Sequence, residues 1–283
     1  MSPKVFIIVL HYQNWNDTNE CLASLKKVDY DNFETIVIDN DKENKGFAGG
    51  NNLGIKQATE KGTDYILLLN NDTVVEPDFL RKLIEAGERE ERIGILGPVI
   101  YEYGSDKIHF AGGKVNWLYT KGIHIQNTKY PGLAKRSGAG KIQDTDYITG
   151  ACLLIKRKVI EKIGSMDEDY FVYCEDVDWC LKAHRNGFSC LVVPDARISH
   201  KVSSIAKIAS FSYIYYHTRN GLLLAKRNAP VLIKILAYLN SFFVYGKQII
   251  KLIIFPQKRL WARAIMKGIE DFYKSRFGKY EPR

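Results

Sequence analysis

The feature that most constrains the fold is an alternation of short apolar runs with helix-forming segments over the first hundred residues. Residues 5–10 (VFIIVL) form an uninterrupted apolar run, as in a strand buried on both faces. Residues 35–38 and 65–69 are two further short apolar runs of the same kind. This rhythm predicts an α/β fold, with a doubly wound, mostly parallel sheet and helices on both of its faces.

Helix signals and later strands complete the pattern. Asn16, Asp17 or Thr18 can cap a first helix through about residue 27. Further helices are expected from the glycines near residue 49 to Gly62, and from Pro77 to about residue 89. The remaining elements are expected at residues 93–101 (strand), 102–145 (loops with short antiparallel strands), 147–155 (a strand interrupted by Gly150), 177–185 (helix) and 190–193 (strand).

Polar residues follow each of the first three predicted strands. They are His11, the Asp39-Asn40 pair and the Asn70-Asn71-Asp72 run. In open parallel sheets the ligand binds beyond the carboxyl ends of the strands. The coincidence therefore predicts a ligand site at this edge of the sheet.

The charge distribution and the cysteine content limit the cellular compartments that suit the chain. The net charge of +9 over 283 residues is uneven, because the chain from Lys201 onward carries 16 Lys and Arg against three acids. The five cysteines are odd in number, scattered and without a C-x-x-C pair, which favours a reducing compartment. The apolar run at residues 5–10 is short and lacks a small-residue cleavage site, so we expect a buried strand rather than a signal peptide.

The C-terminal region differs from the rest of the chain. Residues 229–255 are apolar but interrupted by Lys234, Lys247 and Lys251, with aromatic residues between them. No run of 18 uncharged apolar residues occurs, so a simple spanning helix is not expected. The pattern favours helices lying in a membrane interface, and a packed helical subdomain is the alternative. Because the basic residues lie among apolar runs, an anionic membrane surface is favoured over nucleic acid as the partner.

Two groups of acidic residues could bind a metal ion or act as a catalytic base. Asp72 follows an apolar strand directly, and its carboxylate suits Mg²⁺ or Mn²⁺ shared with a substrate phosphate. The alternative is that Asp72 caps the next helix. Glu175 and Asp176 belong to a run of five carboxylates interleaved with aromatic residues, where an ionised carboxylate can accept a proton from a sugar hydroxyl. The alternative there is helix capping, with Trp179 in the core.

Two further features leave their interpretation open. His200 ends a strand-like run and could be an extra metal ligand, while Lys201 could meet phosphate charge. A lone histidine is also commonly structural. The glycine-rich segment from Gly46 to Gly54 could cradle phosphate at a helix start, although it is neither a G-x-G-x-x-G nor a Walker A motif. Tight packing of this segment against the sheet accounts for the glycines equally well.

Taken together, the motifs resemble the family 2 glycosyltransferases, in particular the rhamnosyltransferases of bacterial polysaccharide assembly. The resemblance runs from Val5 to about Asn228 and is specific in the order and spacing of its pieces. These pieces are VFIIVLHY from Val5, VIDN from Val37, NKGFAGGNNLG from Asn44, LLLNNDT from Leu67, ITGACLLI from Ile148, FVYCEDVDWCL from Phe171, His200, and YYHTRN from Tyr215.

The resemblance implies a GT-A fold over residues 1–204, followed by a basic, apolar helical region over residues 205–283. It implies that Asp39 contacts the nucleotide base or ribose, that Asp72 holds Mg²⁺ or Mn²⁺ against the donor diphosphate, and that His200 approaches the metal. Asp176 would be the general base, with Glu175 helping to bind the acceptor. The remaining implied positions are His11, Asn44, Gly46 and Asn71 for the donor, and Gly150 and Trp179 for the acceptor.

The implied activity is inverting transfer of a sugar, such as rhamnose or another deoxysugar, from a nucleoside diphosphate sugar to a lipid-linked or polysaccharide acceptor. We expect this at the cytoplasmic face of the cell membrane, with the chain bound peripherally. The sequence departs from the family pattern after Asn40, where a turn, a helix and a short strand are missing, and after His200, where a glycine is absent. The alternatives are a catalytically degenerate partner of another transferase and a sugar nucleotidyltransferase.

Overall fold

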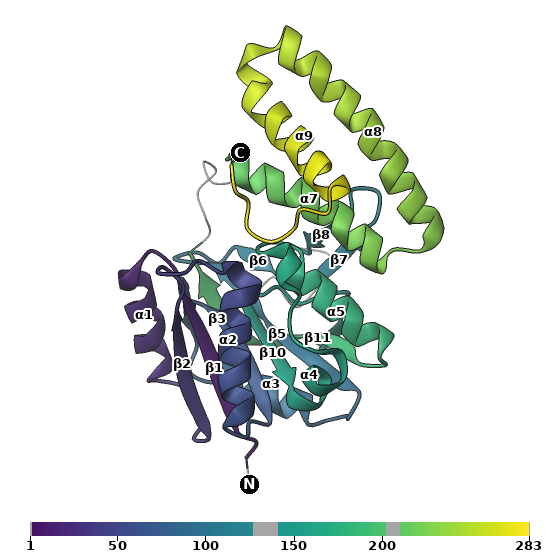
Figure 1. The fold of residues 1–283 in the computed structure, drawn as a ribbon. Helices are drawn as coiled ribbons and strands as arrows, with labels where there is room; N and C mark the ends of the chain where they lie inside the picture. Colours follow the sequence, from purple (N-terminus) through teal and green to yellow (C-terminus); the bar gives the residue numbers. More distant parts are fainter. Residues whose placement is uncertain (1, 127–140, 202–209, 283) are drawn as a thin grey trace.

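The computed structural model describes residues 2–126, 141–201 and 210–282, and its centre is a nine-stranded sheet (Figure 1). Seven strands follow the order β2-β1-β3-β10-β5-β11-β4, while β6 pairs with β5 and β9 pairs with β11. The strands are β1 (Val5–His11), β2 (Phe33–Asp39), β3 (Tyr65–Asn70), β4 (Thr73–Val75), β5 (Ile93–Glu102), β6 (Ile108–Phe110), β9 (Gln143–Asp144), β10 (Cys152–Lys156) and β11 (Ser189–His200). A separate hairpin pairs β7 (Gly113–Asn116) with β8 (Lys121–His124).

Helices surround this sheet and form a layer beyond one end of it. The helices are α1 (Trp15–Leu25), α2 (Gly46–Glu60), α3 (Phe79–Gly87), α4 (Arg157–Ile163), α5 (Glu175–Arg185), α7 (Phe211–Asn228), α8 (Val231–Ile254) and α9 (Arg259–Tyr273), with 3₁₀ turns η1 (Glu168–Tyr170) and η2 (Pro256–Lys258). Figure 1 shows α7, α8 and α9 beyond the end of the sheet where β1 finishes, with α8 farthest from the sheet.

The sheet is mixed, and its five long strands run in one direction. β1 is parallel to β2 and β3, and β11 is parallel to β5. β10 lies antiparallel between β3 and β5, which leaves those two strands parallel to each other. The predicted mostly parallel sheet is therefore confirmed for the long strands, and all five end at one edge. The predicted strand at residues 147–155 begins only at Cys152, after Gly150.

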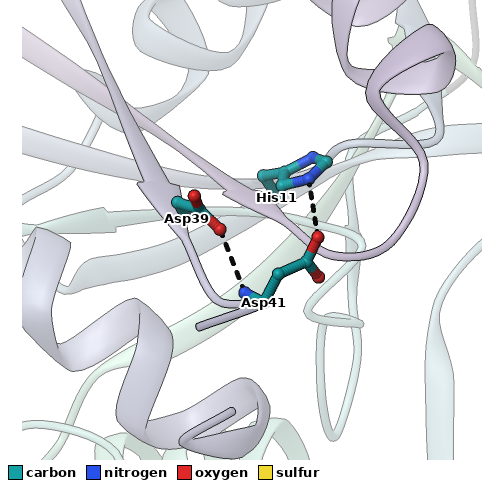
Figure 2. Close-up of side chains that lie close together, drawn as sticks. All are labelled: His11, Asp39 and Asp41. Atoms are coloured by element: carbon teal, nitrogen blue, oxygen red, sulfur yellow. Dashed lines mark hydrogen bonds and ion pairs between the residues drawn. The ribbon is translucent and has the colours of Figure 1, made fainter. Parts of the chain in front are cut away.

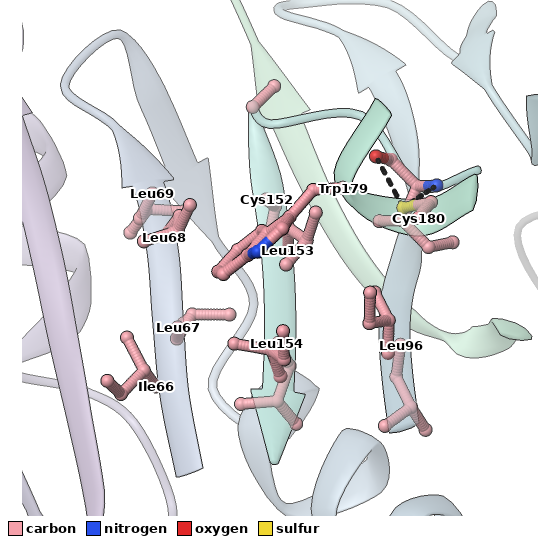
Figure 3. Packing of buried hydrophobic residues seen from close by; sticks show 14 of the residues in the cluster. Ile66, Leu67, Leu68, Leu69, Leu96, Cys152, Leu153, Leu154, Trp179 and Cys180 are labelled. Atoms are coloured by element: carbon pink, nitrogen blue, oxygen red, sulfur yellow. Dashed lines mark hydrogen bonds between the residues drawn. The ribbon is translucent and has the colours of Figure 1, made fainter. Parts of the chain in front are cut away.

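The core lies on both sides of β1 and β3. Every residue of β1 is buried, as the continuous apolar run predicts, and so are the first five residues of β3. Figure 3 shows the leucines of β3 and β10 packed together, with the indole of Trp179 from α5 among them. All five cysteines are free and buried.

The glycines of α2 are explained by packing. A Cβ at Gly50 would lie 2.5 Å from the Leu10 side chain, and one at Gly54 would lie 2.5 Å from that of Ile8. Real Cβ atoms do not approach so closely, so α2 can lie against β1 only with glycine at these positions. Of the two interpretations of the segment from Gly46 to Gly54, the structure supports tight packing.

The C-terminal helices pack against the sheet domain. α7 contacts α5, and Leu222, Leu223 and Leu224 join the same hydrophobic cluster as the sheet. The predicted boundary between residues 204 and 205 lies outside the described residues. Among the helices that are described, none is both long enough and apolar enough to span a bilayer.

Candidate active site at the carboxyl edge of the sheet

The ends of β1, β2, β3 and β11 bring the predicted polar residues to one edge of the sheet. His11 lies opposite Asp39 in the β1–β2 ladder, and Leu10 lies opposite Asn70 in the β1–β3 ladder. His200 ends β11 opposite Thr73 of β4, the residue after Asp72. The parallel arrangement thus places side chains from distant parts of the sequence around one region.

A threonine hydroxyl links the ends of β1 and β3. The buried ring of His11 lies with Nδ1 2.6 Å from the Oγ1 atom of Thr18 on α1. The side-chain amide of Asn71 donates to the same Oγ1 at 3.0 Å. The imidazole also stacks on Trp15, with ring centroids 3.8 Å apart. His11 and Asn71 are therefore held in place by one shared partner.

His11, Asp39 and Asp41 form a group that could hold a cation. One ligand atom from each lies within 4.8 Å of the others. Figure 2 shows His11 Nε2 beside the Asp41 carboxylate, 3.2 Å away, and the backbone N–H of Asp41 donating to Asp39 at 3.0 Å. Both carboxylates are exposed. His11 ends β1, Asp39 ends β2, and Asp41 lies in the connection from β2 to α2, where the sequence departs from the family pattern.

Asp72 and His200 form a second donor pair. The Asp72 Oδ1 atom lies 2.9 Å from His200 Nε2, and the backbone N–H of Lys201 donates to the Asp72 carbonyl at 3.0 Å. This distance is that of a hydrogen bond or ion pair between the two groups, and a carboxylate oxygen with an imidazole nitrogen is also a donor set that Mn²⁺ accepts. The pair was predicted from sequence, and the structure brings its members together.

Asp176 is attached to the same edge through β10. Its carboxylate accepts the backbone N–H of Gly150 at 2.9 Å and that of Val177 at 2.8 Å. The next residue, Ala151, accepts the N–H of Asn70 at 3.0 Å. Two hydrogen bonds on adjacent residues thus connect Asp176 to the end of β3, two residues before Asp72.

Burial sets the proton affinities of the Glu175–Asp176 pair. Glu175 is buried, and its Oε2 atom has no hydrogen-bond partner among the described residues. Burial, and then the nearby Asp176 charge, raises the pKa of Glu175 well above its ordinary value. Burial also raises the pKa of Asp176, against the opposing effect of its two backbone donors. The geometry therefore favours a protonated Glu175 beside Asp176.

A series of ring contacts runs from His200 at the end of β11 to Tyr147. His200 lies 5.7 Å from His109, His109 lies 5.2 Å from His124, and His124 lies 6.1 Å from Tyr147, measured between ring centroids. Burial lowers the pKa of His124 to about 4 and lowers that of His109, so both rings are neutral at pH 7. Burial and the charge of Asp176 raise the pKa of Tyr147. Sequence reasoning missed His109 and His124, which belong to an irregular region without a motif.

Asn44 and Gly46 shape the start of α2 rather than pointing outward. The Asn44 side chain accepts the N–H of Gly46 at 3.0 Å. Gly46 has φ +73°, and a Cβ there would lie 2.2 Å from the carbonyl oxygen of Phe171. That carbonyl accepts the N–H of Phe47 at 2.7 Å. These contacts position the loop that leads to Glu175.

Two predicted assignments disagree with the structure. Trp179 is fully buried and donates its indole N–H to the Gly164 carbonyl at 2.9 Å, so it is a core residue and not an acceptor contact. Lys201, expected to meet phosphate, instead pairs with Asp17 and Glu20 of α1 at 2.5 Å each. The indole of Trp179 packs among the leucines of β3 and β10, which are distant in sequence, so the local motif does not reveal this contact.

The loop before α5 is held by a buried pair on α7. Asn220 donates to the carbonyls of Tyr170, Val172 and Tyr173 at 2.7–2.9 Å. Arg219, fully buried, donates to the carbonyls of Asp169, Tyr170 and Gly278. Phe171, Tyr173 and Cys174 have positive φ, a conformation that needs such support in residues other than glycine. The YYHTRN motif was noted in the sequence, but its role becomes visible only in the structure.

The fold is one that solved glycosyltransferases share. The model of the family described as "Glycosyltransferase like family 2" matches residues 1–220, and the chain belongs to this family.

Relatives and a solved structure place the chain within the family. It is 25% identical over 268 residues to the dTDP-rhamnosyl transferase RfbF of Shigella flexneri, covering 83% of this chain and 84% of the relative. It is 25% identical over 174 residues to the N-acetylglucosaminyl-diphospho-decaprenol L-rhamnosyltransferase of Mycobacterium tuberculosis, covering 59% of this chain and 56% of the relative. The chain is thus rhamnosyltransferase-like.

A mannosyltransferase from Pyrobaculum calidifontis, solved with GDP-Man and Mn²⁺, shares the fold with a TM-score of 0.55 and 13% identity. The match covers 97% of this chain and 88% of that one.

Replacing Asn220 with alanine tests the support of the loop before α5. Three carbonyls would lose their side-chain donor, so we expect the free energy of unfolding to fall by about 2–3 kcal/mol in urea denaturation. Asn19→Ala on the exposed face of α1 is the matched control, with an expected change below about 0.5 kcal/mol. Equal stability of the Asn220→Ala variant and the control would contradict the assignment.

Proposed function

We propose that the chain is an inverting, metal-dependent glycosyltransferase that uses a nucleoside diphosphate sugar. The observation that carries the proposal is the pair of hydrogen bonds through Gly150 and Ala151, which connects Asp176 to the strand end that precedes Asp72. A donor diphosphate at Asp72 and an acceptor hydroxyl at Asp176 then belong to one region. Rhamnose or another deoxysugar is the favoured donor sugar, because RfbF and the mycobacterial relative are named for rhamnosyl transfer.

On the donor side, Asp72 and His200 would hold a divalent ion against the diphosphate. Mn²⁺ suits this pair better than Mg²⁺, because one of the two donors is an imidazole nitrogen. A bound ion would neutralise charge on the leaving nucleoside diphosphate. Asp39, exposed at the end of β2, would contact the ribose or base, and the group around His11 and Asp41 would form the adjacent wall.

On the acceptor side, Asp176 is the general base. A raised pKa improves a carboxylate as a proton acceptor, and a protonated Glu175 leaves the negative charge on Asp176. Asp176 removes the proton of the acceptor hydroxyl, whose oxygen forms a bond to the anomeric carbon. The bond from that carbon to the diphosphate oxygen breaks on the opposite face, and the configuration inverts. Glu175 is too deeply buried to contact an acceptor, so it acts through its neighbour.

The acceptor is proposed to be lipid-linked and reached from a membrane surface. Eleven apolar side chains of α8 are exposed, and only Ala237, Ser241 and Gln248 of this helix are buried. Exposed apolar surface of this extent marks an interaction site. The Lys247 ammonium lies 4.9 Å from the ring of Phe243, the arrangement of a lysine that extends along an apolar surface toward headgroups. We therefore place the protein peripherally at the cytoplasmic face of the cell membrane.

The proposed chemistry is tested with a panel of nucleoside diphosphate sugars and measurement of Mn²⁺-dependent nucleoside diphosphate release. Asp72→Ala should abolish release, whereas Asp176→Asn should reduce transfer by about 10²–10⁴-fold and leave donor binding intact. Asp31→Asn, exposed before β2 at the opposite end of the sheet, is the control and should behave as wild type. Full turnover by the Asp176→Asn variant would refute the assigned base, and absence of any donor turnover would favour a degenerate partner.

Membrane association is tested by sedimentation with vesicles of phosphatidylglycerol and phosphatidylcholine. Leu232 and Leu239 are 67% and 61% exposed on α8. Replacing both with aspartate removes two apolar anchors, so binding should weaken at least about tenfold. Leu53→Asp, on the exposed part of α2, is the control and should bind as wild type. Equal binding of all three proteins would contradict a membrane role for α8.

A further inference from the structure

A pocket of about 580 Å³ opens between the β7–β8 hairpin and the helices α7, α8 and α9. It draws residues from four elements that are far apart in the sequence. The proposed transfer chemistry makes no use of it. Its hairpin side is residues 118–122, and its helical side includes Tyr213, His217, Leu222, Ala237, Val244 and Ile269.

The lining of this pocket is mostly apolar, with several hydroxyl groups, one side-chain amide and one charge. Leu222, Ala237, Val244, Ile265 and Ile269 supply aliphatic surface from three helices. Of the described residues that line the pocket, Lys121 is the only charged one. Its ammonium lies 5.7 Å from the ring of Tyr119. A mostly apolar cavity of this size with one cation suits a ligand that has an apolar body and a single anionic group.

Stacked aromatic rings connect the pocket with the loop before α5. His217 stacks on Tyr173 with ring centroids 4.5 Å apart and an interplanar angle of 18°, and Tyr213 lies 4.2 Å from His217. Tyr173 comes two residues before Glu175. Burial, and then the nearby Lys121 charge, lowers the pKa of His217 to about 4, so this ring is neutral at pH 7. His217 therefore adds no second positive charge to the pocket at pH 7.

We propose that this pocket binds the isoprenoid chain of a lipid-linked acceptor next to its phosphate, with Lys121 pairing with that phosphate. The inference rests on the proposed function and names the acceptor class for it. α8 forms part of the pocket and also carries the exposed apolar residues. A chain seated here would reach from the membrane side of α8 toward Tyr173, which precedes the Glu175–Asp176 pair in the sequence.

The test is direct binding of farnesyl phosphate, a short isoprenoid phosphate, to the full-length protein by isothermal titration calorimetry without vesicles. Val244→Trp fills the pocket and should weaken binding at least tenfold, whereas Val231→Trp, 73% exposed on the same helix, should change it less than twofold. Lys121→Gln should weaken farnesyl phosphate binding about fivefold and leave binding of uncharged farnesol unchanged. Lys247→Gln is its control.

Failure of farnesyl phosphate to bind wild-type protein would overturn the proposal, as would equal weakening by Val244→Trp and Val231→Trp. Unchanged farnesyl phosphate binding by Lys121→Gln would show that Lys121 does not pair with the phosphate, and the proposal as stated would be overturned. Thermal unfolding of each variant confirms that it is folded, and Lys121 lies on the exposed hairpin where folding is least affected. Donor turnover without acceptor is measured separately, so failure of the pocket and failure of the transferase proposal give different results.

Discussion

Two hydrogen bonds on the short segment just before β10 fix the relative positions of α5 and β3 at the site. Gly150 donates to Asp176 on α5, and Ala151 accepts from Asn70 at the end of β3. β10 makes this possible because it enters antiparallel between β3 and β5, so that its start lies where those strands end. A Cβ on Gly150 would lie 2.6 Å from the ring of Phe47, so α2 packs against this segment as well. Asp72 and Asp176, the proposed donor-side and acceptor-side residues, therefore depend on one backbone junction.

The same junction depends on the C-terminal helices. Arg219 and Asn220 of α7 hold the backbone before α5, and Arg219 also binds the carbonyl of Gly278 near the end of the chain. α7 packs on α9, and α9 packs on α8. The helices that expose an apolar face are thus connected through α7 to the loop before α5, the helix that carries Asp176. The face proposed to contact a membrane and the residues that position Asp176 therefore belong to one packed unit.

Much of the fold was predictable because its signals are local. Continuous apolar runs identified β1, β2 and β3, and parallel strands necessarily bring their polar ends to one edge. The three-residue strand β4 was missed, because Thr73–Val75 is too short to show a period. The first helix is capped by Asn14, two residues before the earliest cap expected from sequence. Its side chain accepts the N–H of Asn16, a choice that depends on the course of the preceding loop.

The site was predictable only where a motif marked it. Asp72, His200 and Asp176 stand next to strand or helix ends, and the structure places them around one edge. Trp179, Lys201 and the glycines of α2 have partners that are distant in sequence, so their roles could not be decided from spacing. The histidines at 109 and 124 lie in short strands of an irregular region, where no periodic pattern announces them.

The central claim is that a metal-bound donor lies between Asp72 and Asp176, and locating the metal tests it most directly. Crystals grown with Mn²⁺ and a nucleoside diphosphate would give an anomalous peak at the ion. The account predicts a single strong peak about 2.1–2.3 Å from the carboxylate of Asp72 and from the imidazole of His200. A peak at His11, Asp39 and Asp41 with none at Asp72 would contradict it.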